Sequence, residues 1–271
     1  MKSGNQAIQY RQYRSGRWNT VESGIIVESS VALTVNGEVW LAFMCTPTDL
    51  EALAVGFLYN EGIINSLAEI ADVRVCEHGD NVDVWLNHPA EKPKEWRRTS
   101  GCTGGVTAVD VDITPSVPLN GITISPLEIR KLIESLFESQ DLYRQVGGVH
   151  TSALSDGQAI RVTAEDIGRH NSVDKLAGIC LLNQIELPKK ILLTTGRISS
   201  EMLQKSARLG AAIVISRTSP SSLSIELANK FGVTLIGYAR RDRFNVYAFP
   251  ERIIPEQNRE TIQWQEDGTT P

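Results

Sequence analysis

The chain has 271 residues, 41% of them apolar, and its 27 Lys and Arg against 32 Asp and Glu give a formal net charge of −5 at pH 7. This is the composition of a folded globular protein and excludes an intrinsically disordered chain. The negative charge also argues against broad binding to nucleic acid, which needs an excess of basic groups.

Membrane and secretory signals are missing from the sequence. No stretch reaches the roughly 18 uncharged apolar residues of a membrane span, and the first residues contain no apolar run typical of a signal peptide. We therefore expect a cytoplasmic protein with neither a membrane nor a nucleic-acid partner. The four cysteines are too few for a disulfide framework and are not spaced as metal ligands, so we expect reduced thiols and no metal site.

Residues 1–95 predict a small, β-rich, antiparallel subdomain with one helix. Apolar runs at 31–35 and 39–43 flank Asn36-Gly37, a strong signal for the turn of an antiparallel hairpin. A helix should follow, with Thr48 as its N-cap and Glu51 as the capping-box partner.

Two short strands are expected next, at 73–76 and 82–86, where apolar and polar residues alternate. Residues 87–94 are polar and contain two prolines, which indicates a loop between subdomains.

Residues 96–255 predict an α/β subdomain, followed by a polar tail at 256–271. Ser125, Pro126 and Glu128 combine the signals of a helix N-terminus, and a further helix is expected with Asn171 as its N-cap.

A repeating pattern begins near residue 187. Strands at 191–195, 212–216 and 233–237 alternate with two helices, and 244–248 adds an edge strand. We expect the first helix from about Ser199 to Leu209, and the second to have Ser219 as its N-cap and Pro220 at N1. This β-α-β-α-β order predicts a parallel sheet covered by helices.

The loops that follow the three parallel strands carry the candidate ligand-binding residues. Each loop contains arginine, and ligands of open α/β sheets usually lie beyond the carboxyl ends of the strands. Arginines and helix N-termini together favour a phosphate-bearing ligand, the alternative being that these arginines form surface salt bridges. The residues are Gly196, Arg197, Ser199, Arg217, Tyr238, Ala239, Arg240, Arg241, Asp242 and Arg243.

A charged segment at residues 164–175 has two interpretations. Its residues could cap and ion-pair the helix that follows, with His170 simply packed, or they could form the wall of a site in which Asp166 or Glu165 orients His170 or Arg169. The spacing leaves both open, and we include His170 among the candidate cofactor-binding residues.

Cys102 differs in its surroundings from the other cysteines. It lies among three glycines within residues 101–105, directly after Arg97 and Arg98, and nearby arginines lower a thiol pKa toward the reactive thiolate. Cys45, Cys76 and Cys180 lie among apolar neighbours, as is typical of buried and inert thiols. Cys102 is therefore the candidate nucleophile.

Several motifs in fixed order resemble the FdhD family, the sulfur-carrier accessory proteins of formate dehydrogenase, from about residue 25 to residue 253. The motifs are Val35-Asn36-Gly37-Glu38, Cys45-Thr46-Pro47, Val55-Gly56-Phe57-Leu58-Tyr59-Asn60-Glu61-Gly62-Ile63-Ile64, Gly147-Gly148-Val149-His150, Glu165-Asp166-Ile167-Gly168-Arg169-His170-Asn171 and Thr195-Gly196-Arg197-Ile198-Ser199-Ser200-Glu201.

The resemblance implies a specific activity. The family accepts sulfur from a cysteine desulfurase as a cysteine persulfide and passes it to the molybdenum cofactor, a bis-molybdopterin guanine dinucleotide, before that cofactor enters formate dehydrogenase. It also implies a homodimer and a cytidine-deaminase-like mixed sheet with flanking helices. Cys102 matches the family's persulfide cysteine, and residues 238–243 match its cofactor-contacting stretch.

One departure from the family pattern bears on the mechanism. Many members carry Cys-Gly-x-Cys-Gly in this loop, whereas this chain has only Cys102. A single thiolate can accept a sulfane sulfur and hand it on.

Two alternatives belong to other functional classes. One is a chaperone that binds the molybdenum cofactor without sulfur-transfer chemistry and would need the arginine loops but not Cys102. The other is a zinc deaminase, which needs a His-x-Glu and a Cys-x-x-Cys pair; His150-Thr151-Ser152 and the separated cysteines supply neither, so we discard it.

Overall fold

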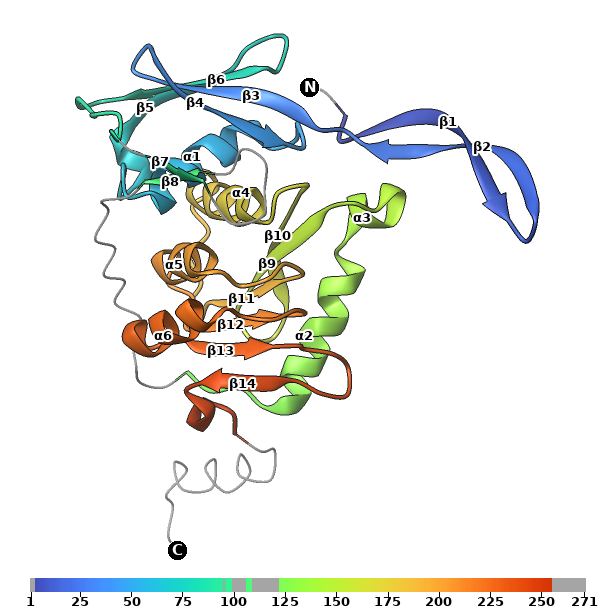
Figure 1. Cartoon of the computed structure of the whole chain (residues 1–271). Helices are drawn as coiled ribbons and strands as arrows, with labels where there is room; N and C mark the ends of the chain where they lie inside the picture. Colours follow the sequence, from blue (N-terminus) through green and yellow to red (C-terminus); the bar gives the residue numbers. More distant parts are fainter. Residues whose placement is uncertain (1–2, 95, 99–105, 109–121, 255–271) are drawn as a thin grey trace, which may run out of the picture. The chain divides into compact units, whose positions relative to one another are not determined.

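The computed structural model describes residues 3–94, 96–98, 106–108 and 122–254, and its elements are drawn in Figure 1. The chain divides into two compact units. Unit 1 comprises Met1–Ile113, Gln140–Ser152 and Val162–Glu186, and unit 2 comprises Thr114–Ser139, Ala153–Arg161 and Leu187–Pro271. The boundary that we expect between residues 95 and 96 stays a prediction, as does the polar tail at 256–271, which lies outside the described residues.

A four-stranded sheet forms the core of unit 1. Its strands are β3 (Ser29–Val35), β4 (Glu38–Cys45), β5 (Ile70–Val75) and β6 (Asn81–Leu86), in the order β4-β3-β6-β5. The predicted hairpin is confirmed, and Asn36 and Gly37 have φ values of 49° and 84°, the left-handed pair that a tight hairpin turn requires. The sheet is mixed rather than purely antiparallel, because β3 and β6 run parallel.

Two helices of unit 1 begin at other residues than the sequence indicates. Helix α1 (Leu50–Asn60) has Asp49 as its N-cap rather than Thr48, whose hydroxyl accepts a hydrogen bond from Lys175 Nζ instead (3.2 Å). Helix α4 (Arg169–Leu182) has Gly168 as its N-cap, so Asn171 lies within the first turn. The Asn171 amide donates to the Met44 carbonyl (2.8 Å) and to Asp166 Oδ1 (2.9 Å), and these tertiary contacts replace the predicted cap.

Helices α1 and α4 pack at backbone contact through two glycines. A Cβ placed on Gly56 would lie 1.8 Å from the Asp174 carbonyl oxygen, and one on Gly178 would lie 1.9 Å from the Ala52 carbonyl oxygen. No side chain fits at either position, so the two glycines set how closely the helices approach.

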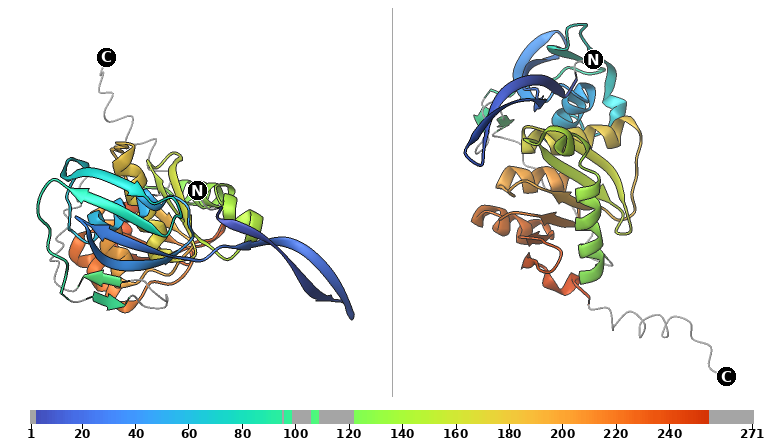
Figure 2. Two further views of the ribbon diagram at one scale, coloured as in Figure 1. Left: turned by 90° about the horizontal axis from the view of Figure 1, so that it is seen from above. Right: turned by 90° about the vertical axis from the view of Figure 1, so that its right-hand side faces the viewer.

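A long hairpin at the start of unit 1 was not predicted. Strands β1 (Asn5–Arg14) and β2 (Arg17–Ile26) pair antiparallel along their whole length and form a sheet of their own. Figure 2 shows this ribbon extending away from the four-stranded sheet of the same unit. Polar and apolar side chains are mixed on both of its faces, so the alternation that reveals a half-buried strand is missing.

Unit 2 contains the predicted parallel strands. Strands β11 (Ile191–Thr194), β12 (Ile213–Ser216) and β13 (Thr234–Gly237) run parallel, and β14 (Asn245–Ala248) pairs antiparallel with β13. Strands β9 (His150–Ser155) and β10 (Ile160–Asp166), of which only residues 153–155 and 160–161 belong to unit 2, complete a sheet of order β10-β9-β11-β12-β13-β14. The mixed α/β class is thus confirmed, and the likeness to cytidine deaminases stays a prediction.

Three helices flank the parallel strands. Figures 1 and 2 show α5 (Ser200–Arg208) and α6 (Ser222–Phe231) on one side of β11, β12 and β13, and α2 (Pro126–Glu138) on the other. Ser125 is the N-cap of α2 as predicted, and α5, whose N-cap is Ser199, begins within one residue of its predicted start. The prediction for α6 is wrong: Ser221 rather than Ser219 is its N-cap, because Pro220 forms a β-bridge with Ile198.

The remaining elements are short. They are α3 (Asp141–Val146), β7 (Trp96–Arg98), β8 (Val106–Ala108) and the 3-10 helices η1 (Leu67–Glu69) and η2 (Pro250–Arg252). Of the helices in the described ranges, none has the length and apolar character to cross a membrane.

The contact between α1 and α4 gives a direct test. We expect Gly178→Ala to lower the free energy of unfolding by about 3 kcal/mol, because the added methyl group forces the two backbones apart. Urea unfolding followed by circular dichroism measures this change. Glu51→Ala, on the exposed side of α1, serves as the control and should cost less than about 1 kcal/mol; equal costs would contradict the packing argument.

Candidate functional site

The loops that follow β11, β12 and β13 meet at Ser216, the last residue of β12. Its hydroxyl donates to the Gly196 carbonyl (2.7 Å) and accepts from the Thr218 amide (2.9 Å). Its carbonyl accepts from the Ala239 amide (3.0 Å). One buried serine therefore links all three loops in which we predict the cofactor-binding residues.

Main-chain hydrogen bonds reinforce this arrangement. The Arg217 amide donates to the Thr194 carbonyl (3.1 Å), and the Tyr238 amide donates to the Thr218 carbonyl (3.0 Å). These hydrogen bonds join main-chain atoms, so they hold the backbone of the loops in place without using the loop side chains.

The connection between β13 and β14 is a tight turn. Tyr238 adopts a left-handed backbone with φ of 51°, and the Arg240 amide donates to the Arg243 carbonyl (2.8 Å). Gly237 precedes the turn, where a Cβ would lie 2.9 Å from both the Pro220 ring and the Tyr247 ring. This position therefore has no room for a side chain and requires glycine.

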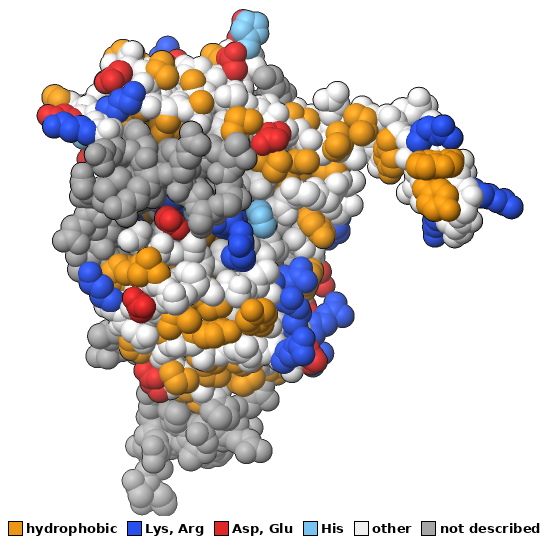
Figure 3. Space-filling view, viewed as in Figure 1, with side chains coloured by type: hydrophobic (Ala, Val, Ile, Leu, Met, Phe, Trp, Pro, Cys, Tyr) orange, Lys and Arg blue, Asp and Glu red, His pale blue; other side chains and the backbone are white. Residues whose placement is uncertain are grey.

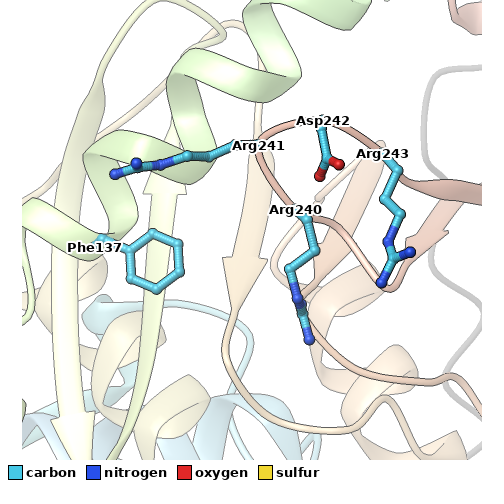
Figure 4. Close-up of a pocket in the computed structure, with 5 residues that line it drawn as sticks. All are labelled: Phe137, Arg240, Arg241, Asp242 and Arg243. Carbon is cyan, nitrogen blue, oxygen red and sulfur yellow. The ribbon is translucent and has the colours of Figure 1, made fainter.

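A pocket of about 600 Å³ opens beside this turn. Its lining residues are Phe137, Arg240, Arg241, Asp242 and Arg243. Figure 4 shows Arg241 extending toward α2 on the side of Phe137, whereas Arg240 and Arg243 extend away from it. Three guanidinium groups against one carboxylate make the pocket suitable for an anion.

The arginines of the pocket have different roles. The Arg240 guanidinium donates through Nη1 to the carbonyls of Arg217 and Ala239 (2.9 Å to the latter), so it ties the turn to the loop after β12. Arg241 is exposed and lies 3.8 Å from the Glu134 carboxylate of α2. Arg243 is exposed on the same turn.

Phe137 is a pocket residue that the sequence did not reveal. Its position on α2 suits a core residue, yet it is only half-buried and lines the pocket. The Arg217 guanidinium carbon lies 4.0 Å from the centre of its ring, a cation–π contact. An arginine that we assigned to the ligand thus packs on an aromatic wall of the same pocket.

The other predicted residues fall into two groups. Gly196, Arg197 and Ser199 lie in the loop between β11 and α5, where Arg197 is exposed and Ser199 Oγ accepts from the Met202 amide (3.4 Å). His170 lies in α4 of unit 1 and is 3% exposed. A cofactor-binding role for all of these residues stays a prediction.

The charged segment before α4 takes part in the packing of unit 1. Glu165 accepts hydrogen bonds from the amides of Leu142 (2.6 Å) and Tyr143 (3.2 Å), and so caps the N-terminus of α3. Asp166 accepts from the amides of Thr46 (3.0 Å) and Gly168 (2.7 Å). These contacts favour the structural interpretation of both carboxylates over a role in orienting His170.

Lys175 completes this network and was missed by sequence reasoning. Its ammonium group is fully buried, lies 2.7 Å from Asp166 Oδ2 and donates to the carbonyls of Thr46 (3.0 Å) and Glu165 (3.2 Å). Sequence reasoning places a lysine in the middle of a helix on the surface, because lysine is rarely buried without an ionic partner.

Residues 26–254 match the profile of the FdhD/NarQ family. The chain belongs to this family. Its similar proteins include the "Sulfur carrier protein FdhD" of Staphylococcus aureus strains JH9 and Newman, each 32% identical over 252 residues that cover 91% of this chain and 95% of the relative. A crystal structure of a formate dehydrogenase accessory protein from Desulfotalea psychrophila superposes with a TM-score of 0.77 at 32% identity, covering 93% of this chain and 100% of that one.

Among the cysteines of this FdhD/NarQ member, Cys102 lies outside the described residues. Cys45 and Cys180 are buried as expected, and burial raises the pKa of the Cys45 thiol to about 12, with the charge of Asp166 adding to the effect and Lys175 opposing it. The expectation for Cys76 is wrong. It follows β5 in the turn toward β6, is half-buried, and its thiol donates to Asp80 Oδ1 (2.9 Å).

These environments predict how the three described thiols react. At pH 8 we expect iodoacetamide to label Cys76 in the native protein and to leave Cys45 and Cys180 unlabelled. A raised pKa keeps the Cys45 thiol neutral well above this pH, and burial shields both unlabelled thiols. Peptide mapping by mass spectrometry measures the label, and the same reaction in urea, where all sites should react, is the control. Rapid native labelling of Cys45 would contradict the structure.

Proposed function

We propose that this protein is a sulfur carrier that takes sulfur from a cysteine desulfurase and passes it to the molybdenum cofactor, bis-molybdopterin guanine dinucleotide, for formate dehydrogenase. The arginine-lined pocket beside the turn at residues 238–243 carries the proposal, because a guanine dinucleotide presents phosphates and a planar base to its protein. The names of the S. aureus relatives and of the D. psychrophila protein support the same role.

The pocket fits the nucleotide part of such a substrate. Its volume of about 600 Å³ lies within the range of small-molecule sites, roughly 300–1,000 Å³. Arg241 and Arg243 can hold phosphate oxygens by two-point contacts, while Arg240 keeps the turn in place. Phe137 adds an aromatic surface, and we also assign Arg197 and Arg217 to the binding of the cofactor's phosphates and guanine.

Cys102 is the proposed sulfur-carrying residue. Two of the other three cysteines are buried, and one of these has a strongly raised thiol pKa, so they are poor nucleophiles. Cys76 is accessible, and it is the thiol against which the assignment of Cys102 must be tested.

The chemistry of transfer balances without a second cysteine in the loop. The Cys102 thiolate attacks the terminal sulfur of the donor's persulfide, the S–S bond of the donor breaks, and the donor leaves as a thiolate. A persulfide on Cys102 results with no net oxidation. Passing this sulfur to molybdenum as a sulfido ligand regenerates the thiolate when two electrons come from the metal or from a thiol reductant.

We propose a cytoplasmic homodimer that meets both a cysteine desulfurase and formate dehydrogenase.

Labelled sulfur tests the carrier role. After incubation with a cysteine desulfurase and ³⁵S-cysteine, we expect wild type and Cys76→Ala to acquire label and Cys102→Ala to acquire none, because only the Cys102 thiolate accepts the sulfur. Protein-bound label that is released by a thiol reductant is measured. If Cys102→Ala gains label as fast as wild type, the assignment is wrong.

The same variant separates the carrier from a chaperone that only binds the cofactor. In cells without the native accessory protein, a chaperone with Cys102→Ala would still restore formate dehydrogenase activity. A sulfur carrier with this substitution would not.

Guanosine diphosphate serves as a probe of the pocket. We expect Arg243→Gln to weaken its binding at least about tenfold, because a charge-assisted contact to phosphate is lost. Isothermal titration calorimetry measures the affinity. Arg161→Gln, which removes an arginine that lies 2.6 Å from Asp156 and does not line the pocket, should bind as wild type does. Equal affinities of Arg243→Gln and wild type would place the nucleotide elsewhere.

A further inference from the structure

The N-terminal hairpin projects from unit 1 and contains no residue that takes part in the proposed sulfur transfer. We call residues 5–26, which comprise β1, β2 and their turn, the arm. Its strands pair in register from Asn5 opposite Ile26 to Arg14 opposite Arg17. Throughout both strands, all of whose residues are described, no side chain is buried.

The arm is fixed at its base. The Val27 amide donates to the Gly4 carbonyl (3.0 Å), and Asn5 Nδ2 donates to Gln145 Oε1 in α3 (2.8 Å). Gly24 lies so close to α3 that a Cβ there would be 2.6 Å from Val146 Cγ1. At about 3.4 Å per residue, the strand beyond these contacts reaches about 25 Å, which is enough to cross the face of a neighbouring domain.

Large side chains that favour protein interfaces are concentrated near the tip. Tyr13 and Trp18 form a directly opposed pair with ring centres 5.3 Å apart, and they are 62% and 60% exposed. The Arg11 guanidinium lies over the Trp18 ring at 5.4 Å. On the other face, Tyr10 is exposed in the middle of the arm and Ile25 is exposed near its base, opposite Gln6. Tyr, Trp and Arg are the residues that most often dominate binding energy at interfaces.

A ribbon of two strands gains little stability by itself. An isolated hairpin is marginally stable in water, and both of its edges offer unpaired backbone groups. An arm of this length with exposed aromatic residues is therefore expected to pack on a second surface.

Charge indicates which surface this is. Arg11, Arg14 and Arg17 against Glu22 give the arm a charge of +2, so the rest of a chain with net charge −5 carries −7. We call the residues outside the arm the body. Two positively charged arms repel each other, whereas a positively charged arm and the negatively charged body of another copy attract each other. Figure 3 shows the basic and apolar side chains that lie together on the arm.

We propose that the arm docks on the acidic body of a second copy of this chain, and that the two copies exchange arms reciprocally. Reciprocal exchange covers both arms and closes the assembly as a two-fold dimer. The proposal rests on the arm alone and does not depend on Cys102 or on the arginine-lined pocket. It deepens the homodimer of the proposed function by assigning the contact that forms it.

Dimer dissociation tests the proposal. Sedimentation equilibrium should show wild type as a dimer, and the double variant Tyr13→Ser/Trp18→Ser should raise the dissociation constant at least about tenfold, as expected on loss of two aromatic anchors. Leu223→Ser, which removes a 50% exposed residue of α6, is the matched control and should dimerise as wild type does. Unchanged circular dichroism verifies that the variants remain folded.

Crosslinking identifies the surface that the arm contacts. A photoreactive phenylalanine analogue in place of Tyr13, in an equal mixture of ¹⁴N- and ¹⁵N-labelled protein, should yield mixed-isotope crosslinks from the arm to residues outside it. High salt should weaken the dimer through the charge contribution. The proposal is overturned by a wild type that stays monomeric at its highest soluble concentration, by crosslinks confined to one chain or to arm–arm pairs, or by a double variant that dimerises as tightly as wild type. In the last case the homodimer itself would stand.

Discussion

The buried ion pair between Lys175 and Asp166 is the interaction on which unit 1 depends. It joins the end of β10, the middle of α4 and the segment between β4 and α1, and each of its charged groups is satisfied by further hydrogen bonds. Such a pair adds little stability compared with apolar residues of equal size, yet loss of one partner costs about 3–5 kcal/mol because a charge is left buried. The pair therefore acts mainly to specify which segments meet, and the backbone contact of α1 with α4 through Gly56 and Gly178 requires that arrangement.

The pocket of unit 2 depends on a different principle. Parallel strands deliver their carboxyl ends to one edge, and there Ser216 joins three loops through backbone partners. Arg240 adds a side-chain contact to this frame, because its guanidinium donates to two carbonyls. A helix from an earlier part of the chain contributes Phe137. A frame that is already fixed lowers the entropic cost of binding a ligand in the pocket, because the loops need not become ordered when the ligand binds.

Sequence patterns predicted the features that depend on neighbouring residues. The Asn36-Gly37 hairpin, the capping box at Ser125 and the alternating strands and helices after residue 187 all have local signals, and all are present. The wrong N-cap predictions at Thr48, Asn171 and Ser219 share one cause, which is a contact with a residue distant in the sequence. Thr48 bonds Lys175, Asn171 bonds Met44, and Pro220, the neighbour of Ser219, forms a bridge with Ile198. Lys175, Phe137 and the arm have no local signal. Burial of a lysine and exposure of an aromatic residue are set by tertiary contacts, and a ribbon that is exposed on both faces lacks the alternation of a half-buried strand.

The adjacent carboxylates of Glu165 and Asp166, at the end of β10, bind different parts of unit 1. Asp166 holds the core, while Glu165 binds the first amides of α3, the short helix against which Gly24 and Asn5 fix the base of the arm. Glu165 therefore helps to set the direction in which the arm leaves unit 1, although it lies far from the arm in the sequence. Under the proposed exchange of arms, a substitution of Glu165 would alter assembly and leave the chemistry at Cys102 untouched.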